Sequence, residues 1–334
     1  MSTEPQRIVV GNGDFEYEPV PGWGQLPVGW IFYDVVGTAT DSRDRVYVFN
    51  RGGHPIIIFE PDGTFVKTWG EGEFTRPHGI SVGPDDVLYL SDDSDHTVRK
   101  YTPDGERLLT LGTSGQPSDT GVSNADYRTI TQGKGPFNLP TNLALSSDGE
   151  MYVTDGYGNA RVHKFTPDGT LLFSWGEPGD GPGQFNLPHG LGVDKEGHVY
   201  VADRENSRIQ IFDKNGTFLN QWTDVVRPTQ VFIDPHGTVF VSELGGHAGL
   251  YPWMTPSPEV SGGRVSVFDI EGNLQARWGG GNDPCTPGDF FSPHDISVDS
   301  KGDVYVGEVT MSAGGKDGMV PEDCPALQKF IRRT

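Results

Sequence analysis

A repeat of about 40 residues runs through nearly the whole chain and limits the possible fold more than any other feature. Each copy has an apolar strand, an Asp-Gly-type turn, a VYV-like strand, an R-x-x-F-like strand, a PDG-like turn and a strand ending near Trp-Gly. The copies span residues 35–70, 74–112, 137–176, 185–222, 227–279 and 290–331. Four short β-branched and aromatic runs per copy, bounded by Gly, Pro and Asp, are typical of a propeller blade. We therefore predict an all-β protein, a six-bladed β-propeller of four-stranded blades.

The last copy shows only three strand signals before the sequence ends. We expect its fourth strand to be residues 7–10 (RIVV), so that the two ends of the chain pair and close the ring. Closure of this kind removes an exposed edge strand that would invite aggregation. Residues 1–334 then form a single propeller domain. The repeat resembles the NHL class of propellers, most closely at VYVADRENSRIQIFDKNG (residues 199–216).

The net charge of the chain limits the classes of partner that it can bind. A formal net charge of -21 argues against nucleic acid and against an anionic membrane surface, because both need clustered Lys and Arg. No apolar run approaches the roughly 18 residues of a membrane span. The first residues lack the basic and apolar regions of a signal peptide, so we expect a cytoplasmic protein. The sequence leaves the oligomeric state open.

Histidine recurs at one position of the repeat. When the copies are aligned on their first strand, the position two residues before the I/L-S/G/A-V run is a histidine in every second copy. These histidines are His78, His189 and His294. The other copies have Val36, Thr141 and Thr229 there. Because the first strand of each blade lines the central channel, we expect the three imidazoles to converge near the axis. Three imidazoles with an open fourth position match a catalytic zinc site.

A simpler interpretation of these histidines is structural. Pro-His-Gly and Pro-His-Asp could merely begin a strand, with the imidazole making ordinary hydrogen bonds. A single histidine would favour that interpretation. Its occurrence in alternate copies, and in none of the others, favours a metal site.

A second register lies at the end of the second strand, on the face where the first strand begins. The third position after the VYV-like motif is Arg51 in the first copy and Arg204 in the fourth, and in the third copy it is a glycine followed by Tyr157. The first and fourth blades are opposite, so we expect the arginines to approach the metal from two sides. Arginine forks bind carboxylates, which predicts a small anionic substrate. The alternatives are surface arginines paired with a nearby acid, such as Asp203 or Glu205, and a core or stacking tyrosine.

Three segments exceed the minimal repeat length: residues 113–135, 244–263 and 309–324. All are expected to emerge at the end of the ring that carries the histidines. Long loops gathered on one face usually carry function. Cys285 and Cys324 should also lie at this end; they could form one disulfide, and the sequence leaves their pairing open.

Several motifs, in this order along nearly the whole chain, resemble the peptidyl-α-hydroxyglycine α-amidating lyase family. They are FNRGGH (49–54), RPHGIS (76–81), DGYGNARV (155–162), LPHGL (187–191), VADRENSRIQ (201–210) and SPHDI (292–296). The animal members have a methionine where this chain has Ser292.

The resemblance implies a cofactor set and roles for individual residues. The three histidines would hold zinc, Tyr157 would act as the catalytic base, and Arg51 and Arg204 would be substrate-site arginines. A structural calcium in the channel would be bound by the backbone carbonyls of Thr38 and Ile80 and by the carboxylate of Asp295. Carboxylate and carbonyl oxygens are the hard donors that calcium prefers, whereas imidazole suits zinc.

The expected reaction is zinc-dependent cleavage of the N–Cα bond of an α-hydroxyglycine, which releases an amide and glyoxylate. A zinc-dependent hydrolase or lyase acting on another small carboxylate substrate, or on a lactone, is the first alternative. A non-enzymatic NHL scaffold that binds other proteins is the second, and it gives no reason for histidines in alternate blades.

Overall fold

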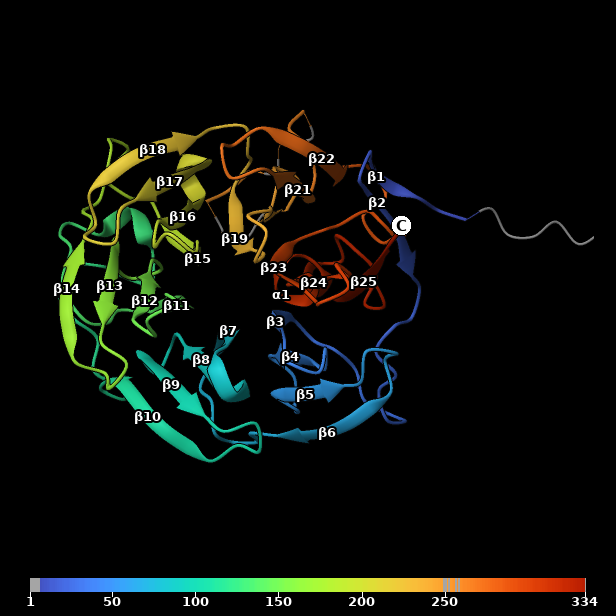
Figure 1. The fold of residues 1–334 in the computed structure, drawn as a ribbon, viewed down its shortest axis with the longest axis horizontal. Coiled ribbons are helices and arrows are strands. Elements are labelled where there is room, and N and C mark those ends of the chain that lie inside the picture. The colour runs from blue at the N-terminus through green and yellow to red at the C-terminus, as the bar shows by residue number, and fades with distance from the viewer. Residues whose placement is uncertain (1–6, 249–250, 252, 256, 258, 334) are drawn as a thin grey trace, which may run out of the picture.

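Six antiparallel sheets are arranged as blades around a central channel (Figure 1). The computed structural model describes residues 7–248, 251, 253–255, 257 and 259–333. The predicted all-β, six-bladed propeller is confirmed. In each blade the first strand lies at the channel; the later strands follow outward in sequence order in five blades, and N-terminal strands complete the outer edge of the sixth.

The strands follow the repeat closely. In blade order they are β3 (Val35–Thr40), β4 (Val46–Asn50), β5 (Ile56–Phe59) and β6 (Phe65–Trp69); β7 (Pro77–Val82), β8 (Leu88–Asp92), β9 (Thr97–Tyr101) and β10 (Arg107–Gly112); β11 (Pro140–Leu145), β12 (Met151–Asp155), β13 (Arg161–Phe165) and β14 (Leu171–Trp175); β15 (Pro188–Val193), β16 (Val199–Asp203), β17 (Arg208–Phe212) and β18 (Phe218–Trp222); β19 (Pro228–Ile233), β20 (Val239–Glu243), β21 (Arg264–Phe268) and β22 (Leu274–Gly279); and β23 (Pro293–Val298), β24 (Val304–Glu308) and β25 (Leu327–Arg332).

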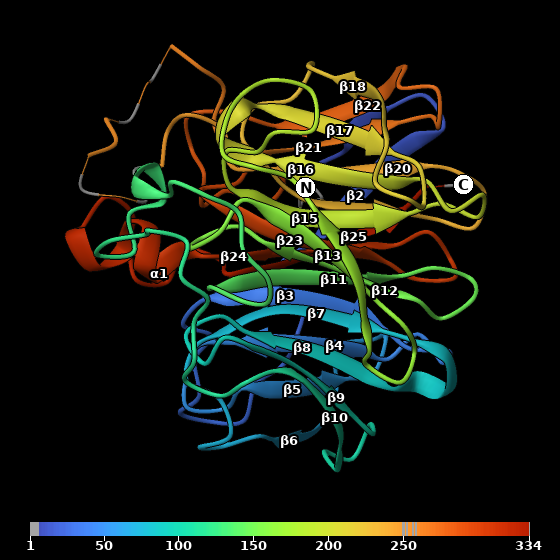
Figure 2. The same cartoon turned by 90° about the vertical axis from the view of Figure 1, so that its left-hand side faces the viewer.

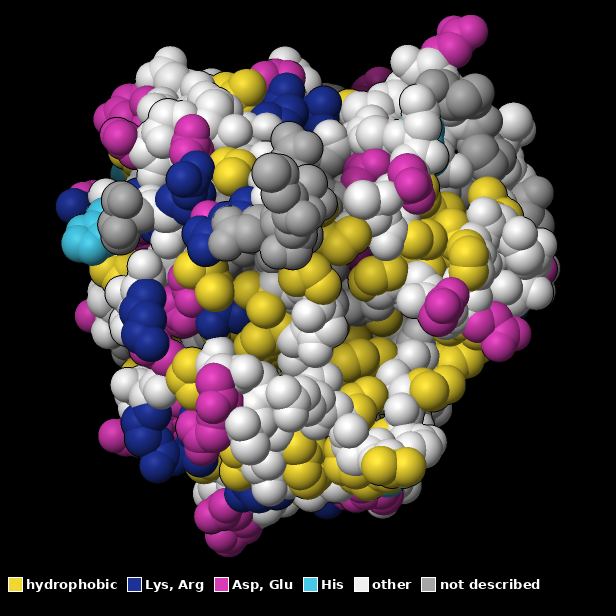
Figure 3. All heavy atoms as spheres, turned by 90° about the vertical axis from the view of Figure 1, so that its right-hand side faces the viewer, with side chains coloured by type: hydrophobic (Ala, Val, Ile, Leu, Met, Phe, Trp, Pro, Cys, Tyr) yellow, Lys and Arg dark blue, Asp and Glu magenta, His cyan; other side chains and the backbone are white. Residues whose placement is uncertain are grey.

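An N-terminal strand closes the ring, but it is not the predicted one. The strand that pairs with β25 is β2 (Phe15–Val20), and β1 (Val10–Asn12) pairs with the outer edge of β2. Residues 7–9 of the predicted segment form no strand. Burial explains the difference: Tyr17 of β2 is fully buried against Trp278 of the neighbouring blade, whereas Ile8 and Val9 are 44% and 41% exposed. Figure 3 shows this side of the ring, with hydrophobic side chains exposed across its middle.

The hydrophobic core lies between neighbouring blades rather than at one centre. One cluster joins Tyr152 and Val162 of the third blade to Val199 and Phe212 of the fourth. The PDG-like turns join the outer strands; in the third blade Gly169, at φ +91°, donates its amide to Thr166 O at 2.9 Å. Glycine adopts this left-handed conformation without steric cost, which explains its recurrence in the repeat.

The second strand of each blade ends in a residue whose side chain binds the backbone just before the first strand of that blade. These residues are Asn50, Asp92, Asp155, Asp203, Glu243 and Glu308. Each accepts hydrogen bonds of 2.5–3.1 Å from backbone amides just before the first strand of its blade. The clamp fixes where each first strand enters the channel, and so where its second residue lies.

The helices are few and short: α1 (Thr310–Ala313) and the 3-10 helices η1 (Pro84–Asp86), η2 (Tyr127–Thr129), η3 (Arg204–Asn206) and η4 (Gly315–Asp317). In Figure 2, α1, η2 and the loop after β20 project from the same end of the ring. Residues 249–250, 252, 256 and 258 of the predicted insert at 244–263, and the ends of the chain at 1–6 and 334, lie outside the described residues. No described helix is long and apolar enough to cross a membrane.

Candidate metal centre

The three register histidines meet at one end of the channel. Each is the second residue of a first strand, in β7, β15 and β23. Their ring centroids are 4.7–4.9 Å apart, and one nitrogen of each lies within 4.8 Å of the corresponding nitrogens of the others. All three side chains are buried.

Hydrogen bonds to the next blade determine which nitrogen faces the centre. Each Nδ1 meets a backbone carbonyl from the same register position of the following blade. The pairs are His78 with Thr141 O at 2.7 Å, His189 with Thr229 O at 2.7 Å and His294 with Val36 O at 2.8 Å. A carbonyl only accepts, so each Nδ1 carries the proton and each Nε2 presents a lone pair toward the axis. Such a bond orients imidazoles that ligate metals.

The intervening blades hold the histidine strands in place. Thr141 Oγ1 donates to Pro188 O at 3.2 Å, and Thr229 Oγ1 donates to Pro293 O at 3.0 Å. These carbonyls belong to the residues that directly precede two of the histidines. Blade one has valine at the threonine position, and there Arg51 Nε donates instead to Pro77 O at 3.0 Å.

The imidazoles are neutral at ordinary pH. Burial lowers the pKa of all three histidines well below the usual value, and neighbouring positive charge lowers it further. His294 Nε2 is buried with no hydrogen-bond partner among the described residues. Three neutral imidazoles with converging lone pairs, one of them unsatisfied, fit a divalent transition metal such as zinc.

Tyr157 lies beside this point. Its hydroxyl is 3.2 Å from His78 Nε2 and 3.0 Å from His189 Nε2. Arg204 places Nη1 at 3.4 Å from the same hydroxyl and its guanidinium 5.5 Å from the centre of the tyrosine ring. Tyr157 is therefore neither a core aromatic nor remote from the histidines.

The two predicted arginines reach the site in different ways. Arg204 is fully buried; it pairs with Glu205 at 2.8 Å, as the surface alternative expected, but it also donates to Tyr251 Oη at 3.0 Å. Arg51 lies 3.8 Å from Asp34 and 3.9 Å from Asp93, and its buried Nη2 has no hydrogen-bond partner among the described residues. Both guanidiniums therefore line the cavity instead of pointing into solvent.

A cavity of about 330 Å³ opens beside His294. Arg51, Tyr157 and Arg204 line it together with residues to which the sequence assigned no role in the site. These are Arg76, Ser94, Ala125, Leu139, Thr229, Leu244, Tyr251, Ser292, Val309 and Ser312. Arg76 forms an ion pair with buried Asp93, and its guanidinium lies 5.7 Å from the centre of the Tyr157 ring. The sequence could have indicated Arg76, because it stands two residues before His78. Ser292, which also lines the cavity, has the same position before His294.

Tyr251, which lines the cavity, is backed by aromatic residues from two inserts. Tyr251 and Trp253 stack at 4.8 Å with an angle of 5°, and Tyr127 meets Tyr251 edge-on at 5.3 Å. Arg128 lies 4.1 Å above the ring of Trp253. The sequence predicts long loops here but not which of their side chains face the cavity.

The third insert braces Arg51. The amide of Ser312, on α1, donates to Asp34 Oδ1 at 3.0 Å, and its hydroxyl bonds the other carboxylate oxygen. Cys285 and Cys324 form a disulfide across 39 residues, which ties this insert to the connection before the sixth blade. The pairing that the sequence left open is thus present.

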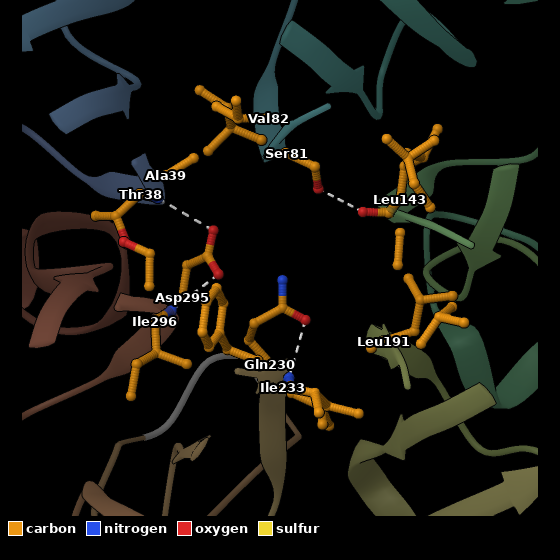
Figure 4. A pocket seen from close by; sticks show the side chains of 18 of the residues that line it. Thr38, Ala39, Ser81, Val82, Leu143, Leu191, Gln230, Ile233, Asp295 and Ile296 are labelled. Atoms are coloured by element: carbon orange, nitrogen blue, oxygen red, sulfur yellow. Dashed lines mark hydrogen bonds between the residues drawn. The ribbon is translucent and has the colours of Figure 1, made fainter. Parts of the chain in front are cut away.

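Deeper in the channel lies the second predicted site (Figure 4). Asp295 accepts from Thr38 N at 3.1 Å and from Ile296 N at 2.8 Å, yet burial raises the pKa of its carboxyl to about 8. Ile80 and Gln230 line the same 240 Å³ cavity, and no Lys or Arg does among the described residues. A buried carboxylate without a basic partner among the described residues of this cavity fits a bound calcium.

A glycine allows this close approach of blades. A Cβ added to Gly37 would lie 2.5 Å from Ile80 Cγ2 and 3.2 Å from Asp295 Oδ2. A bulge in the pairing of β23 with β24, between Pro293 and Asp295, also contributes. Neighbouring residues of a regular strand point to opposite faces, and the bulge lets both His294 and Asp295 face the channel.

Comparison with known proteins agrees with this architecture. The NHL repeat family profile matches residues 185–212. NHL repeat-containing protein 3 of Homo sapiens is 32% identical over 308 residues, covering 85% of this chain and 81% of that protein. Peptidyl-α-hydroxyglycine α-amidating lyase 1 of Drosophila melanogaster is 31% identical over 301 residues, covering 81% of this chain. The chain spans only 50% of the length of that lyase.

Among solved structures, a gluconolactonase from Xanthomonas campestris superposes with a TM-score of 0.60 at 14% identity, covering 99% of this chain and 96% of that one. This likeness shows a shared fold. Fold and site together define a six-bladed propeller with three converging histidines at one end of its channel. The chain belongs to the family of NHL-repeat propellers that contains NHL repeat-containing protein 3 and the peptidyl-α-hydroxyglycine α-amidating lyases.

Proposed function

We propose that this chain is a zinc-dependent lyase that cleaves the N–Cα bond of an α-hydroxyglycine-type substrate to an amide and glyoxylate. The observation that carries the proposal is the convergence of three imidazole lone pairs beside the Tyr157 hydroxyl. Zinc bound there supplies a Lewis acid that holds the substrate and acidifies its α-hydroxyl. The similarity to the fly lyase supports this reaction over others.

Tyr157 is the proposed base. Its hydroxyl is held between two histidine nitrogens and Arg204 Nη1, at the point where a substrate α-hydroxyl would lie. Acting as the phenolate, Tyr157 accepts the proton of the α-hydroxyl while that oxygen forms the aldehyde carbonyl of glyoxylate and the N–Cα bond breaks. The electron pair of that bond goes to the amide nitrogen, which takes up the same proton from Tyr157. No other reactant is consumed.

Arg51 is the proposed partner of the substrate carboxylate. Its Nε is occupied by Pro77 O, whereas its buried Nη2 makes no hydrogen bond among the described residues and lies 3.9 Å from the carboxylate of Asp93. A charge-assisted hydrogen bond from Nη2 would orient the carboxylate and compensate its charge. Arg204 acts at a different point, because it is already engaged with Tyr157 and Tyr251 and therefore orients the base.

A structural calcium is proposed at Asp295, with the carbonyls of Thr38 and Ile80 as further ligands. These residues line one cavity, and calcium there would neutralise the buried carboxylate. The calcium would join first strands from three blades, since Thr38 is in β3, Ile80 in β7 and Asp295 in β23. Its expected contribution is to stability.

The proposed partner is a small anionic substrate. The cytoplasmic location stays a prediction from the sequence. The Cys285–Cys324 bond weighs against it, because disulfides persist in oxidising compartments and are rare in the cytosol.

The deciding experiment measures glyoxylate release from N-acyl-α-hydroxyglycines by zinc-loaded protein. Tyr157→Phe should keep its zinc and lose about 10²–10⁴-fold in kcat, because general base catalysis contributes that much. Near-normal turnover in this variant contradicts the base assignment. Hydrolysis of lactones without glyoxylate release would favour the hydrolase alternative. Lactones are included in the test because the fold is shared with a gluconolactonase. Absence of any bound transition metal after reconstitution would favour a binding scaffold.

A further inference from the structure

Three buried polar atoms in the lining of the metal-site cavity lack a hydrogen-bond partner among the described residues. They are Arg51 Nη2, His294 Nε2 and Ser292 Oγ. Leaving a buried polar group without a hydrogen bond is unfavourable, so each is expected to meet a ligand. The proposed function uses the first for the substrate carboxylate and the second for zinc. It leaves Ser292 unexplained.

Ser292 is held rigidly at this place. Its side chain is 1% exposed, and it stands two residues before His294 at the end of the clamp made by Glu308. Its amide donates to Glu308 Oε2 at 3.1 Å, and its carbonyl accepts from Val309 N at 3.0 Å. Because the backbone is bonded on both sides, the hydroxyl remains on the cavity wall.

The substrate chemistry shows what this hydroxyl can bind. In an N-acyl-α-hydroxyglycine the α-hydroxyl and the carboxylate are engaged by zinc, Tyr157 and Arg51. The remaining polar group is the amide. Its carbonyl oxygen is an acceptor that a serine hydroxyl can satisfy. As the N–Cα bond breaks, negative charge spreads from nitrogen onto that oxygen, so a donor here stabilises the transition state more than the substrate.

We propose that Ser292 is a specificity-determining residue whose hydroxyl donates a hydrogen bond to the carbonyl oxygen of the departing amide. The inference rests on the proposed function and extends it. It assigns the substrate class as N-acyl or N-carbamoyl derivatives, in which the carbonyl lies next to the scissile nitrogen. It also explains why a hydroxyl is buried near His294 with no hydrogen-bond partner in the described part of the chain.

The test uses binding of two stable hydroxy acids and needs no turnover. The first is a 2-hydroxy-4-oxo acid, in which CH₂ replaces the scissile N–H and the carbonyl is kept. The second is the 2-hydroxy acid of equal length with that carbonyl reduced to CH₂. Both are titrated calorimetrically into zinc-loaded wild type, Ser292→Ala and Ser91→Ala. Ser91 is the matched control, because its hydroxyl is also buried without a partner among the described residues but lies outside the cavity lining.

Wild type and Ser91→Ala should bind the oxo acid about three- to tenfold more tightly than its reduced counterpart, the worth of one neutral hydrogen bond. Ser292→Ala should lose this preference. An unchanged preference in Ser292→Ala overturns the assignment, and so does equal binding of both acids by wild type; the proposed function survives either result. Failure of zinc-loaded wild type to bind either hydroxy acid overturns the proposed function itself, and the Ser292 role with it.

Discussion

The two candidate ion sites of the channel are built from the same first strands, yet they differ in almost every physical respect. The histidine site has three imidazoles, guanidiniums from Arg51, Arg76 and Arg204, and long inserts above it. The Asp295 site has one carboxylate, backbone groups and apolar walls. From this contrast we expect the first site to exchange a ligand with solvent and the second to hold an ion between blades.

The contrast also separates what each site should control. Arginines and unsatisfied polar atoms at the histidine end cost stability until a ligand binds, as is common where function requires it. At the Asp295 end, strands from three blades meet around one charge. Damage to the first site should therefore remove activity and leave the fold, and damage to the second should loosen the fold.

The largest effect is expected for His189→Ala. Removal of one imidazole leaves two lone pairs and opens the hydrogen bond to Thr229 O, so zinc content should fall below a tenth of an equivalent and glyoxylate release by at least about 10³-fold. Inductively coupled plasma mass spectrometry and a glyoxylate assay measure both. The melting temperature in the presence of calcium should change by less than it does in Asp295→Asn.

His236→Ala is the matched control for this variant, because His236 is exposed and is not one of the three converging histidines. It should keep full zinc content and activity. Full zinc content in His189→Ala would show that the metal binds elsewhere and would end the distinction between the two sites.

A smaller effect, on stability alone, is expected for Asp295→Asn. A calcium ion present at about 100 times its Kd stabilises the folded state by about 2.7 kcal/mol, which corresponds to about 4 °C in melting temperature for a chain of 334 residues. Wild type should show this loss on addition of EGTA, as followed by circular dichroism. Asp295→Asn should melt at the lower temperature with or without calcium, while zinc stays bound to the histidines. A wild type that is indifferent to EGTA and contains no calcium contradicts the site.

The blades and the histidine register could be predicted because both are periodic. A turn or an imidazole that recurs at one position of the repeat occupies the equivalent place in each blade. Aligning the copies therefore predicts where these residues lie in the propeller. The same argument placed Arg51 and Arg204, which follow their second strands. It also placed Asp295 beside Thr38 and Ile80, once the family resemblance had named them.

What the sequence could not supply depends on contacts outside the repeat. The closing strand is Phe15–Val20 because Tyr17 packs against Trp278, whereas the more apolar residues 7–10 misled the prediction. Tyr251 faces the cavity through a bond to Arg204, and Ser292 through a backbone clamp of its own blade. Neither has a counterpart of the same type at its position in the other copies, so no register revealed them.

Glu308→Gln is expected to change only the pH dependence of stability, and it tests the clamp that places His294. Glu308 accepts from the amides of Phe291 and Ser292, and among the described residues the one side chain that donates to it is that of Gln328. The corresponding acid of the fourth blade, Asp203, is instead paired with Arg208. Burial raises the pKa of Glu308 to about 8, above the ordinary value of 4.5. The folded state therefore binds a proton that the unfolded state releases, and stability is lost as pH rises from about 4.5 to 8. In urea unfolding, the free energy of unfolding of wild type should fall by up to about 1 kcal/mol per pH unit over this range, and that of Glu308→Gln should not. Parallel pH profiles in the two proteins would show that Glu308 is ionised in the clamp. The start of the sixth blade would then be bound by a carboxylate, as in the blades whose clamp residue is paired with an arginine.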